Sequence, residues 1–195
     1  MAVPNSEALD FSQAPFLVLW ELTRACTLAC AHCRAEAVRH RHPEELSTQE
    51  GERLLEEIAG FGTPLPLLVL TGGDPLLRPD VYDLVEAAAR RGFRVALTPS
   101  GTAAVTREKL RRLKEAGLGR LAVSLDGSTP EVHDGFRRVR GAHGWTLKII
   151  ESAHAIGLPF QINSTVTRQN LTDLPAIASL LEPLGIVLWA VFFLV

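Results

Sequence analysis

The chain has 195 residues, of which 47% are hydrophobic and 22% are charged, and its formal net charge is −2. This balance is typical of one globular domain with a sizeable core, and it excludes a disordered or collagen-like polymer. It gives no basic excess that would favour nucleic acid or an anionic membrane as a partner. Because the N-terminus lacks a secretory-signal pattern and the longest apolar stretch, 185–195, is too short to span a membrane, we expect a cytoplasmic protein.

The predicted elements alternate regularly between helices and apolar strands. A first strand is predicted over Phe16–Trp20. Five helices are expected to begin at Ser47, Asp80, Thr106, about Trp145 and about Asp173. The strands that follow them are Leu67–Leu70, Phe93–Leu97, Leu121–Leu125, Phe160–Val166 and Ile186–Val195. Continuously apolar strands joined by helices indicate a parallel sheet with right-handed crossovers. A longer interval, roughly 127–144, precedes the fifth strand as an insertion, and periodicity alone does not separate a closed barrel, a partial barrel and a doubly wound sheet.

Polar and glycine residues gather where the predicted strands end. They occupy Thr23–Cys33, Thr71–Pro75, Thr98–Gly101 and Ser124–Gly127, and Asn163 lies on the fifth strand. In parallel α/β folds the chemistry is located at the carboxyl ends of the strands. We therefore expect the functional site at this edge of the sheet.

All three cysteines of the chain lie in the first of these segments, as Cys26, Cys30 and Cys33. An odd number does not suit a closed disulfide framework. Three interpretations are open: buried apolar cysteines, a zinc site that would need His40 or His42 as its fourth ligand, or an iron–sulfur cluster. Polar neighbours disfavour the first interpretation, and the basic stretch around the two histidines reads more simply as a solvated loop. An iron–sulfur cluster held by three cysteines has one iron without a protein ligand.

The segment Leu19–Cys33 resembles the cluster loop of the radical S-adenosylmethionine (SAM) enzymes, with His32 in place of the residue, usually aromatic, before the last cysteine. The resemblance spans essentially the whole chain and is nearest to the SPASM and haem-modifying branch. It implies a partial (β/α)6 barrel of six parallel strands alternating with five helices, truncated at the sixth strand. On this interpretation residues 1–15 are an N-terminal extension and 16–195 form the core of a longer enzyme.

The resemblance also implies a set of cofactor-binding residues. Cys26, Cys30 and Cys33 would bind three irons of a [4Fe–4S] cluster, and SAM would chelate the fourth. The run Gly72-Gly73-Asp74-Pro75 resembles the motif that meets the amino group of SAM, where glycines let backbone carbonyls approach the ammonium; the family often has Glu at the position of Asp74. The other expected contacts are His32 before the last cysteine, Ser124, Asp126 and more weakly Ser100 for the ribose, Arg137 for the cofactor carboxylate, and Asn163 on the fifth strand. For Arg137, a surface arginine is the alternative.

The activity implied by the resemblance is reductive cleavage of SAM by the cluster. The resulting 5′-deoxyadenosyl radical abstracts hydrogen from a substrate, with a peptide or a tetrapyrrole as the expected class. A one-electron reductant such as flavodoxin or ferredoxin would supply the electron, and no side-chain acid, base or nucleophile is required. Two alternatives are a non-catalytic zinc- or cluster-stabilised α/β module and an α/β nucleotide-binding protein. The second alternative is disfavoured because no phosphate-loop pattern accompanies Gly72 and Gly73.

Overall fold

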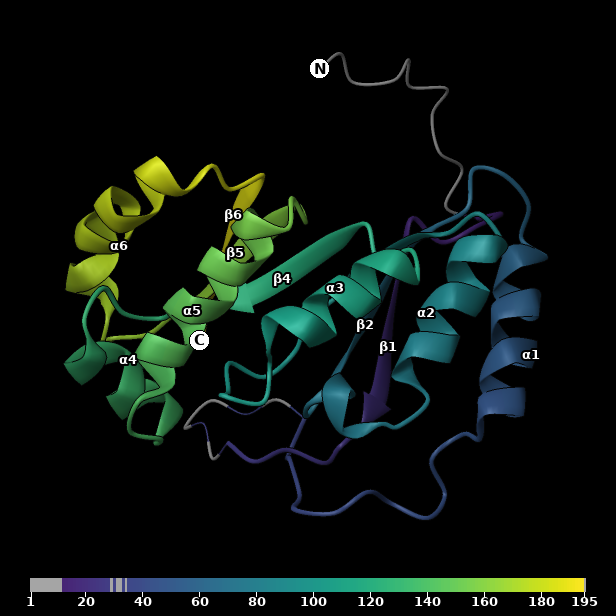
Figure 1. The fold of residues 1–195 in the computed structure, drawn as a ribbon, viewed down its shortest axis with the longest axis horizontal. Coiled ribbons are helices and arrows are strands. Elements are labelled where there is room, and N and C mark those ends of the chain that lie inside the picture. The colour runs from purple at the N-terminus through teal and green to yellow at the C-terminus, as the bar shows by residue number, and fades with distance from the viewer. Residues whose placement is uncertain (1–11, 29, 31–32, 34, 195) are drawn as a thin grey trace.

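The computed structural model describes residues 12–28, 30, 33 and 35–194. Within this part of the chain, six parallel strands form one sheet in the sequential order β1-β2-β3-β4-β5-β6. Their bounds are β1 Leu17–Thr23, β2 Leu67–Gly72, β3 Arg94–Leu97, β4 Arg120–Ser124, β5 Phe160–Val166 and β6 Leu188–Phe193. Because each strand is added beside the previous one, all the crossovers advance in the same direction around a curved sheet (Figure 1).

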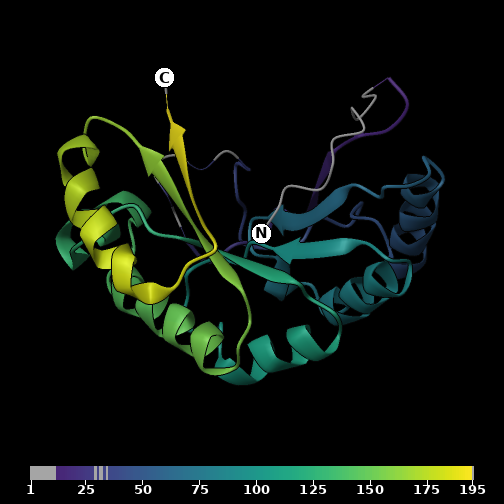
Figure 2. The same cartoon turned by 90° about the horizontal axis from the view of Figure 1, so that it is seen from above.

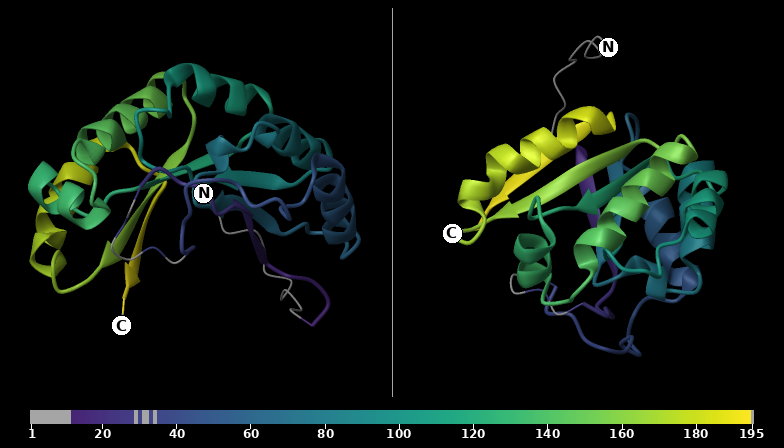
Figure 3. Two further views of the ribbon diagram at one scale, coloured as in Figure 1. Left: turned by 90° about the horizontal axis from the view of Figure 1, so that it is seen from below. Right: turned by 60° about the vertical axis from the view of Figure 1, so that its left-hand side comes forward.

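The helices cover one face of the sheet. They are α1 Thr48–Ala59, α2 Val81–Arg90, α3 Arg107–Glu115, α4 Pro130–Arg137, α5 Ala142–Ala155 and α6 Leu174–Leu181, with short 3-10 turns η1 Pro75–Leu77, η2 Leu171–Asp173 and η3 Glu182–Leu184. Figures 2 and 3 show them in an arc outside the curved sheet, while the inner face of the strands carries no helix. None of the helices in the described part of the chain is long and apolar enough to cross a membrane.

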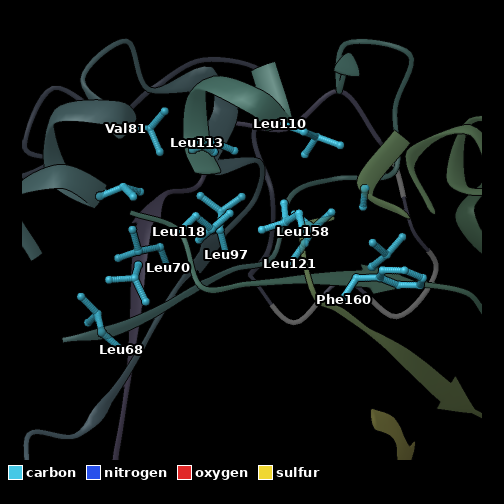
Figure 4. Close-up of a cluster of buried hydrophobic side chains, with 14 of the residues drawn as sticks. Leu68, Leu70, Val81, Leu97, Leu110, Leu113, Leu118, Leu121, Leu158 and Phe160 are labelled. Carbon is cyan, nitrogen blue, oxygen red and sulfur yellow. The ribbon is translucent and has the colours of Figure 1, made fainter. Parts of the chain in front are cut away.

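The hydrophobic core lies between the helices and the outer face of the strands. Leu68 and Leu70 of β2 have no exposed surface, whereas Leu67 and Val69, which alternate with them along the strand, are partly exposed on the inner face. Leucines of neighbouring strands and helices extend the same layer, as Figure 4 shows for Leu97, Leu110, Leu113 and Leu121. The alternation of buried and partly exposed residues along β2 and β5 therefore indicates which face the helices cover.

The predicted architecture is confirmed, with differences at particular elements. The insertion contains a helix, α4, that the sequence analysis did not predict, so two helices join β4 to β5. This helix has only eight residues and contains Gly135, so its apolar periodicity is too short to identify. The first strand continues to Thr23, beyond the predicted end at Trp20, because its pairing with β2 extends to Gly72.

Candidate active site at the carboxyl ends of the strands

The three cysteine side chains line one pocket at the carboxyl ends of the strands. The pocket has a volume of about 210 Å³. Its walls come from the loop after β1 and from the ends of β2, β3 and β4. The lining residues are Cys26, Leu28, Cys30, Cys33, Ala35, Ala37, Thr71, Gly72, Gly73, Thr98, Pro99, Ser100, Ser124 and Arg137. The pocket thus collects, from four successive strand exits, most of the positions that the sequence analysis singled out.

Each cysteine sulfur accepts a hydrogen bond, and all three thiols are free. The main-chain N–H of Leu28 lies 3.4 Å from Cys26 Sγ, and that of Ala37 lies 3.4 Å from Cys33 Sγ. Burial raises the pKa of the Cys30 thiol, and the nearby guanidinium of Arg137 opposes this rise only in part. Cys26 is buried, Cys30 half-buried and Cys33 exposed, so solvent exposure increases along the chain from the first cysteine to the last.

These thiols fit a cluster better than a single ion. Among the residues that the structure describes, no three His, Cys, Asp or Glu side chains are gathered tightly enough to hold one metal ion. Cluster ligation differs because each cysteine binds a different iron. His42, one candidate for the fourth zinc ligand, is exposed and pairs with Glu44 instead. His32 lies outside the described residues, so its predicted contact stays a prediction.

The cysteine loop, residues 24–46, is fastened at both ends by a buried arginine that the sequence analysis missed. Arg78 is 2% exposed and donates from Nη1 to the carbonyls of Leu22 and Leu46, at 3.3 and 2.9 Å. Its Nε and Nη2 lie 2.9 and 2.5 Å from the carboxylate of Asp80. Burial raises the pKa of Asp80, but hydrogen bonds from Arg78 and Thr48 outweigh it and lower that pKa to about 2. An Arg-Pro-Asp run before a helix resembles an ordinary surface turn, so nothing in the local pattern indicates this clamp.

Gly72 and Gly73 are required by contact between two loops. A Cβ on Gly72 would lie 2.3 Å from the carbonyl oxygen of Thr23, and one on Gly73 would lie 2.4 Å from that of Ala25. The same backbones are joined by hydrogen bonds of 2.7 Å, from Gly73 N–H to Thr23 and from Asp74 N–H to Ala25. The sequence analysis attributed these glycines to the approach of a ligand. That approach stays a prediction, since both glycines line the pocket; the structure adds that their lack of a side chain lets this turn pack on the cysteine loop.

Asp74 is not among the residues that line the pocket, and its expected contact with the cofactor stays a prediction. Its side chain is 1% exposed, and its Oδ1 accepts the N–H groups of Leu76 and Ser100, at 3.1 and 3.4 Å. Burial raises the pKa of this carboxyl, and the two hydrogen bonds lower it in part. The next residue, Pro75, is buried at the first position of η1. Asp74 thus acts within the protein, where it caps η1 and ties it to the loop after β3.

Ser100 links three parts of the site. Its Oγ donates to the carbonyl of Gly73 at 2.9 Å and lies 3.0 Å from Cys26 Sγ. It therefore joins the loop after β3 both to the glycine turn and to the most buried cysteine. The sequence analysis predicted, more weakly than for Ser124 and Asp126, that Ser100 contacts the ribose of the cofactor. In the structure, Ser100 lines the pocket and contacts protein groups there.

The structure brings Arg137 into the pocket and keeps Asp126 and Asn163 out of its wall. The side chain of Arg137 is only 12% exposed, so the alternative of a surface arginine is wrong. Asp126 is fully buried and forms an ion pair with Arg137. Asn163, on β5, accepts a hydrogen bond from Gln161 at 2.9 Å and is not among the lining residues. Of the polar residues predicted to meet the ribose or carboxylate of the cofactor, Ser100, Ser124 and Arg137 line the pocket.

A partial parallel barrel with three cysteines at the carboxyl end of its sheet is typical of one class of iron–sulfur proteins. Comparison of the chain with known protein families, sequences and structures identifies the same class. The sequence profile of the Radical SAM superfamily matches residues 20–181. The chain is 44% identical to the "AdoMet-dependent heme synthase" of Oleidesulfovibrio alaskensis over 95% of its length and 47% of that protein. It is 34% identical to the "PqqA peptide cyclase" of Ruegeria pomeroyi over 94% of its length and 49% of that protein. The structure of Streptococcus suis SuiB bound to S-adenosylmethionine matches 93% of the chain and 41% of its own, with a TM-score of 0.80 at 17% identity.

The chain belongs to the radical SAM superfamily. It spans about half the length of the curated relatives that it matches. Membership implies a [4Fe–4S] cluster and SAM as cofactors, together with a reductant and a substrate.

Proposed function

We propose that this chain forms the cluster-binding core of a radical SAM enzyme that modifies a tetrapyrrole. The observation that carries the proposal is the convergence of all three cysteines on one pocket with Gly72, Gly73, Ser124 and Arg137. When bound, the cluster supplies the electron that cleaves SAM into methionine and a 5′-deoxyadenosyl radical, which takes a hydrogen atom from the substrate. The protein's part is to hold, orient and shield these groups.

Cys26, Cys30 and Cys33 would hold three irons and leave the fourth open to SAM. Arg137 presents a fork of N–H donors at the pocket wall, which suits the cofactor carboxylate. Ser124 lies at the end of β4, where its hydroxyl can serve the ribose. Since Cys33 is the exposed cysteine, we expect a flavodoxin- or ferredoxin-like donor to approach on its side of the pocket.

The choice of a tetrapyrrole follows from the relatives. The heme synthase from O. alaskensis is 44% identical to the chain, against 34% for the peptide cyclase from R. pomeroyi. Both matches cover nearly the whole chain, so the difference in sequence identity does not arise from a difference in the length aligned. A peptide is the second candidate substrate class.

The test of the cluster is the variant Cys30→Ala in the full-length, anaerobically reconstituted protein. The wild type is expected to be brown, with iron and sulfide bound, and to form 5′-deoxyadenosine with dithionite and SAM. The variant is expected to lose most of its iron and all of this product, because one of three cluster ligands is missing. The exposed-loop variant His42→Ala is the control and should retain both. Turnover by Cys30→Ala would overturn the assignment, as would a colourless wild type containing zinc.

The substrate class is tested with two probes on the same preparation. A carboxylate-bearing iron porphyrin is expected to increase 5′-deoxyadenosine formation and to be chemically altered, as followed by mass spectrometry. The PqqA peptide, named as the substrate of the R. pomeroyi cyclase, should do neither. The reverse result would favour the peptide-modifying branch and leave the cluster assignment intact.

A further inference from the structure

The carboxylate of Asp126 is held in place by groups other than Arg137. Its Oδ1 accepts the main-chain N–H of Thr165, on β5, at 2.8 Å. The main-chain N–H of Asp126 donates to His133 Nδ1 at 3.1 Å, and its carbonyl accepts from Asn170 Nδ2 at 2.8 Å. The side chain has no exposed surface. Hydrogen bonds to α4 and to the loop after β5 thus fix the main chain of Asp126 at the end of β4, and the N–H of Thr165 on β5 holds its carboxylate.

Arg137, by contrast, is a long side chain at the last position of α4, and its place depends on its partners. Its Nη2 lies 2.5 Å from Asp126 Oδ2, and its Nη1 lies 3.6 Å from Cys30 Sγ. One planar guanidinium therefore joins the fixed carboxylate to a cysteine of the pocket. A guanidinium in so buried a place would be costly without a paired anion, and Asp126 provides that anion.

We propose that Asp126 is a positioning residue, whose buried carboxylate holds the guanidinium of Arg137 against Cys30 at the pocket wall and does not itself contact the cofactor. The inference rests on the proposed function and replaces the expectation that Asp126 binds the ribose. Its consequence is twofold. An N–H directed at a cluster-ligating sulfur influences the electronic state of the cluster. A guanidinium with a fixed orientation offers its remaining donors to the carboxylate of SAM without further ordering.

The test is a double-mutant cycle in the full-length, cluster-reconstituted protein. The variants are Asp126→Asn, Arg137→Met and the pair together, with Glu131→Gln, an exposed carboxylate on the same helix, as the control. The readouts are the dissociation constant of SAM on the oxidised cluster and the electron paramagnetic resonance spectrum of the reduced cluster. Each single variant is expected to weaken SAM binding about tenfold, the loss typical of a charge-assisted hydrogen bond. The double variant should bind no more weakly than Arg137→Met alone, and all three spectra should change in the same way.

Additive losses would overturn the inference, because they would mean that Asp126 acts without Arg137. Wild-type binding by Asp126→Asn would overturn it as well. If the proposed function itself is wrong, the result is a different one: the wild-type protein would assemble no iron–sulfur cluster.

A measurement on the wild type covers the case in which Asp126→Asn does not fold. In a crystal structure of the reconstituted protein with SAM, the Asp126 carboxylate is expected on Arg137. A carboxylate hydrogen-bonded to the ribose hydroxyls would overturn the inference.

Discussion

His133 lies one turn before Arg137 on α4 and is 1% exposed. Its Nδ1 accepts the main-chain N–H of Asp126, which requires an unprotonated nitrogen at that position. Burial lowers the pKa of this imidazole, the cationic Arg137 lowers it further, and the resulting value is about 4. The ion pair at the pocket thus stands beside a histidine that stays neutral in the folded protein.

This histidine predicts how stability responds to acid. The imidazole binds a proton near pH 6.5 in the unfolded chain but only near pH 4 in the folded one, so its contribution is complete above pH 6.5 and is lost as the pH falls toward 4. We expect about 3 kcal/mol of unfolding free energy to disappear across this interval. Urea unfolding from pH 7 to pH 4 measures it. His133→Gln should flatten this part of the profile, whereas His154→Gln, at an exposed position on α5, should not; equal slopes for the two variants would contradict the prediction.

Sequence reasoning was most reliable for residues whose chemistry depends on spacing along the chain. The three cysteines were located by spacing alone, and all three line the pocket. Asp126 and Asp74 were assigned to the cofactor from the resemblance to the family's motifs at strand ends, and in the structure both carboxylates accept hydrogen bonds from main-chain N–H groups. Whether a carboxylate at a strand end faces a ligand or an arginine depends on contacts from distant segments, here Arg137, Thr165 and Ser100, which local sequence does not specify.

At the scale of elements, the site depends on how the turn after β2 packs on the loop after β1. Two short hydrogen bonds and two glycines join them. Ser100 then attaches the loop after β3 to the same turn. The pocket wall is therefore one hydrogen-bonded unit made from three strand exits.

Gly73→Ala is expected to break this unit. Its Cβ would overlap the backbone carbonyl of Ala25, and backbone cannot move aside as a flexible side chain can. We expect a loss of about 2 kcal/mol of unfolding free energy, in the range typical of overpacking, together with reduced iron retention. Gly135→Ala is the matched control: its Cβ would meet nothing within 4 Å, and alanine in α4 should be neutral or stabilising by about 1 kcal/mol. Denaturant unfolding of the apoprotein and iron analysis test both variants, and equal behaviour would show that the loop contact is unimportant.

Long, periodic elements were predictable and short ones were not. The capping box at Ser47 and Glu50 is present at the start of α1, with Ser47 Oγ accepting the N–H of Glu50. The helix α4 was missed, and it carries both Arg137 and His133. The helix that was not predicted thus provides the arginine of the pocket wall, and its eight residues leave little periodic signal in the sequence.

At the scale of the whole molecule, β1 and β6 are the two edges of the sheet, and neither is paired on its outer side by any residue that the structure describes. On β6, Phe192 and Phe193 are 55% and 67% exposed, and Leu188 is 46% exposed. An apolar strand with unpaired N–H and C=O groups favours pairing with another chain.

We therefore expect the 195-residue chain to self-associate through β6. Phe192→Lys should shift it toward the monomer, because a charge on the edge strand opposes pairing. The matched control is Phe61→Lys, since Phe61 is equally exposed, at 55%, but follows α1. Light scattering over a concentration series measures the change. A chain that is monomeric before any substitution, or equal responses from the two variants, would rule out association through this edge.

The contiguous hydrophobic cluster between the strands and the helices contains none of the three cysteines; Cys26 is buried, but it lies in the loop after β1, outside that cluster. A polypeptide whose interior is complete without its thiols can leave the ribosome and fold before any iron is delivered. Under iron shortage, cells should therefore accumulate folded apoprotein that lacks the cluster and can still bind it, and this apoprotein should not be degraded.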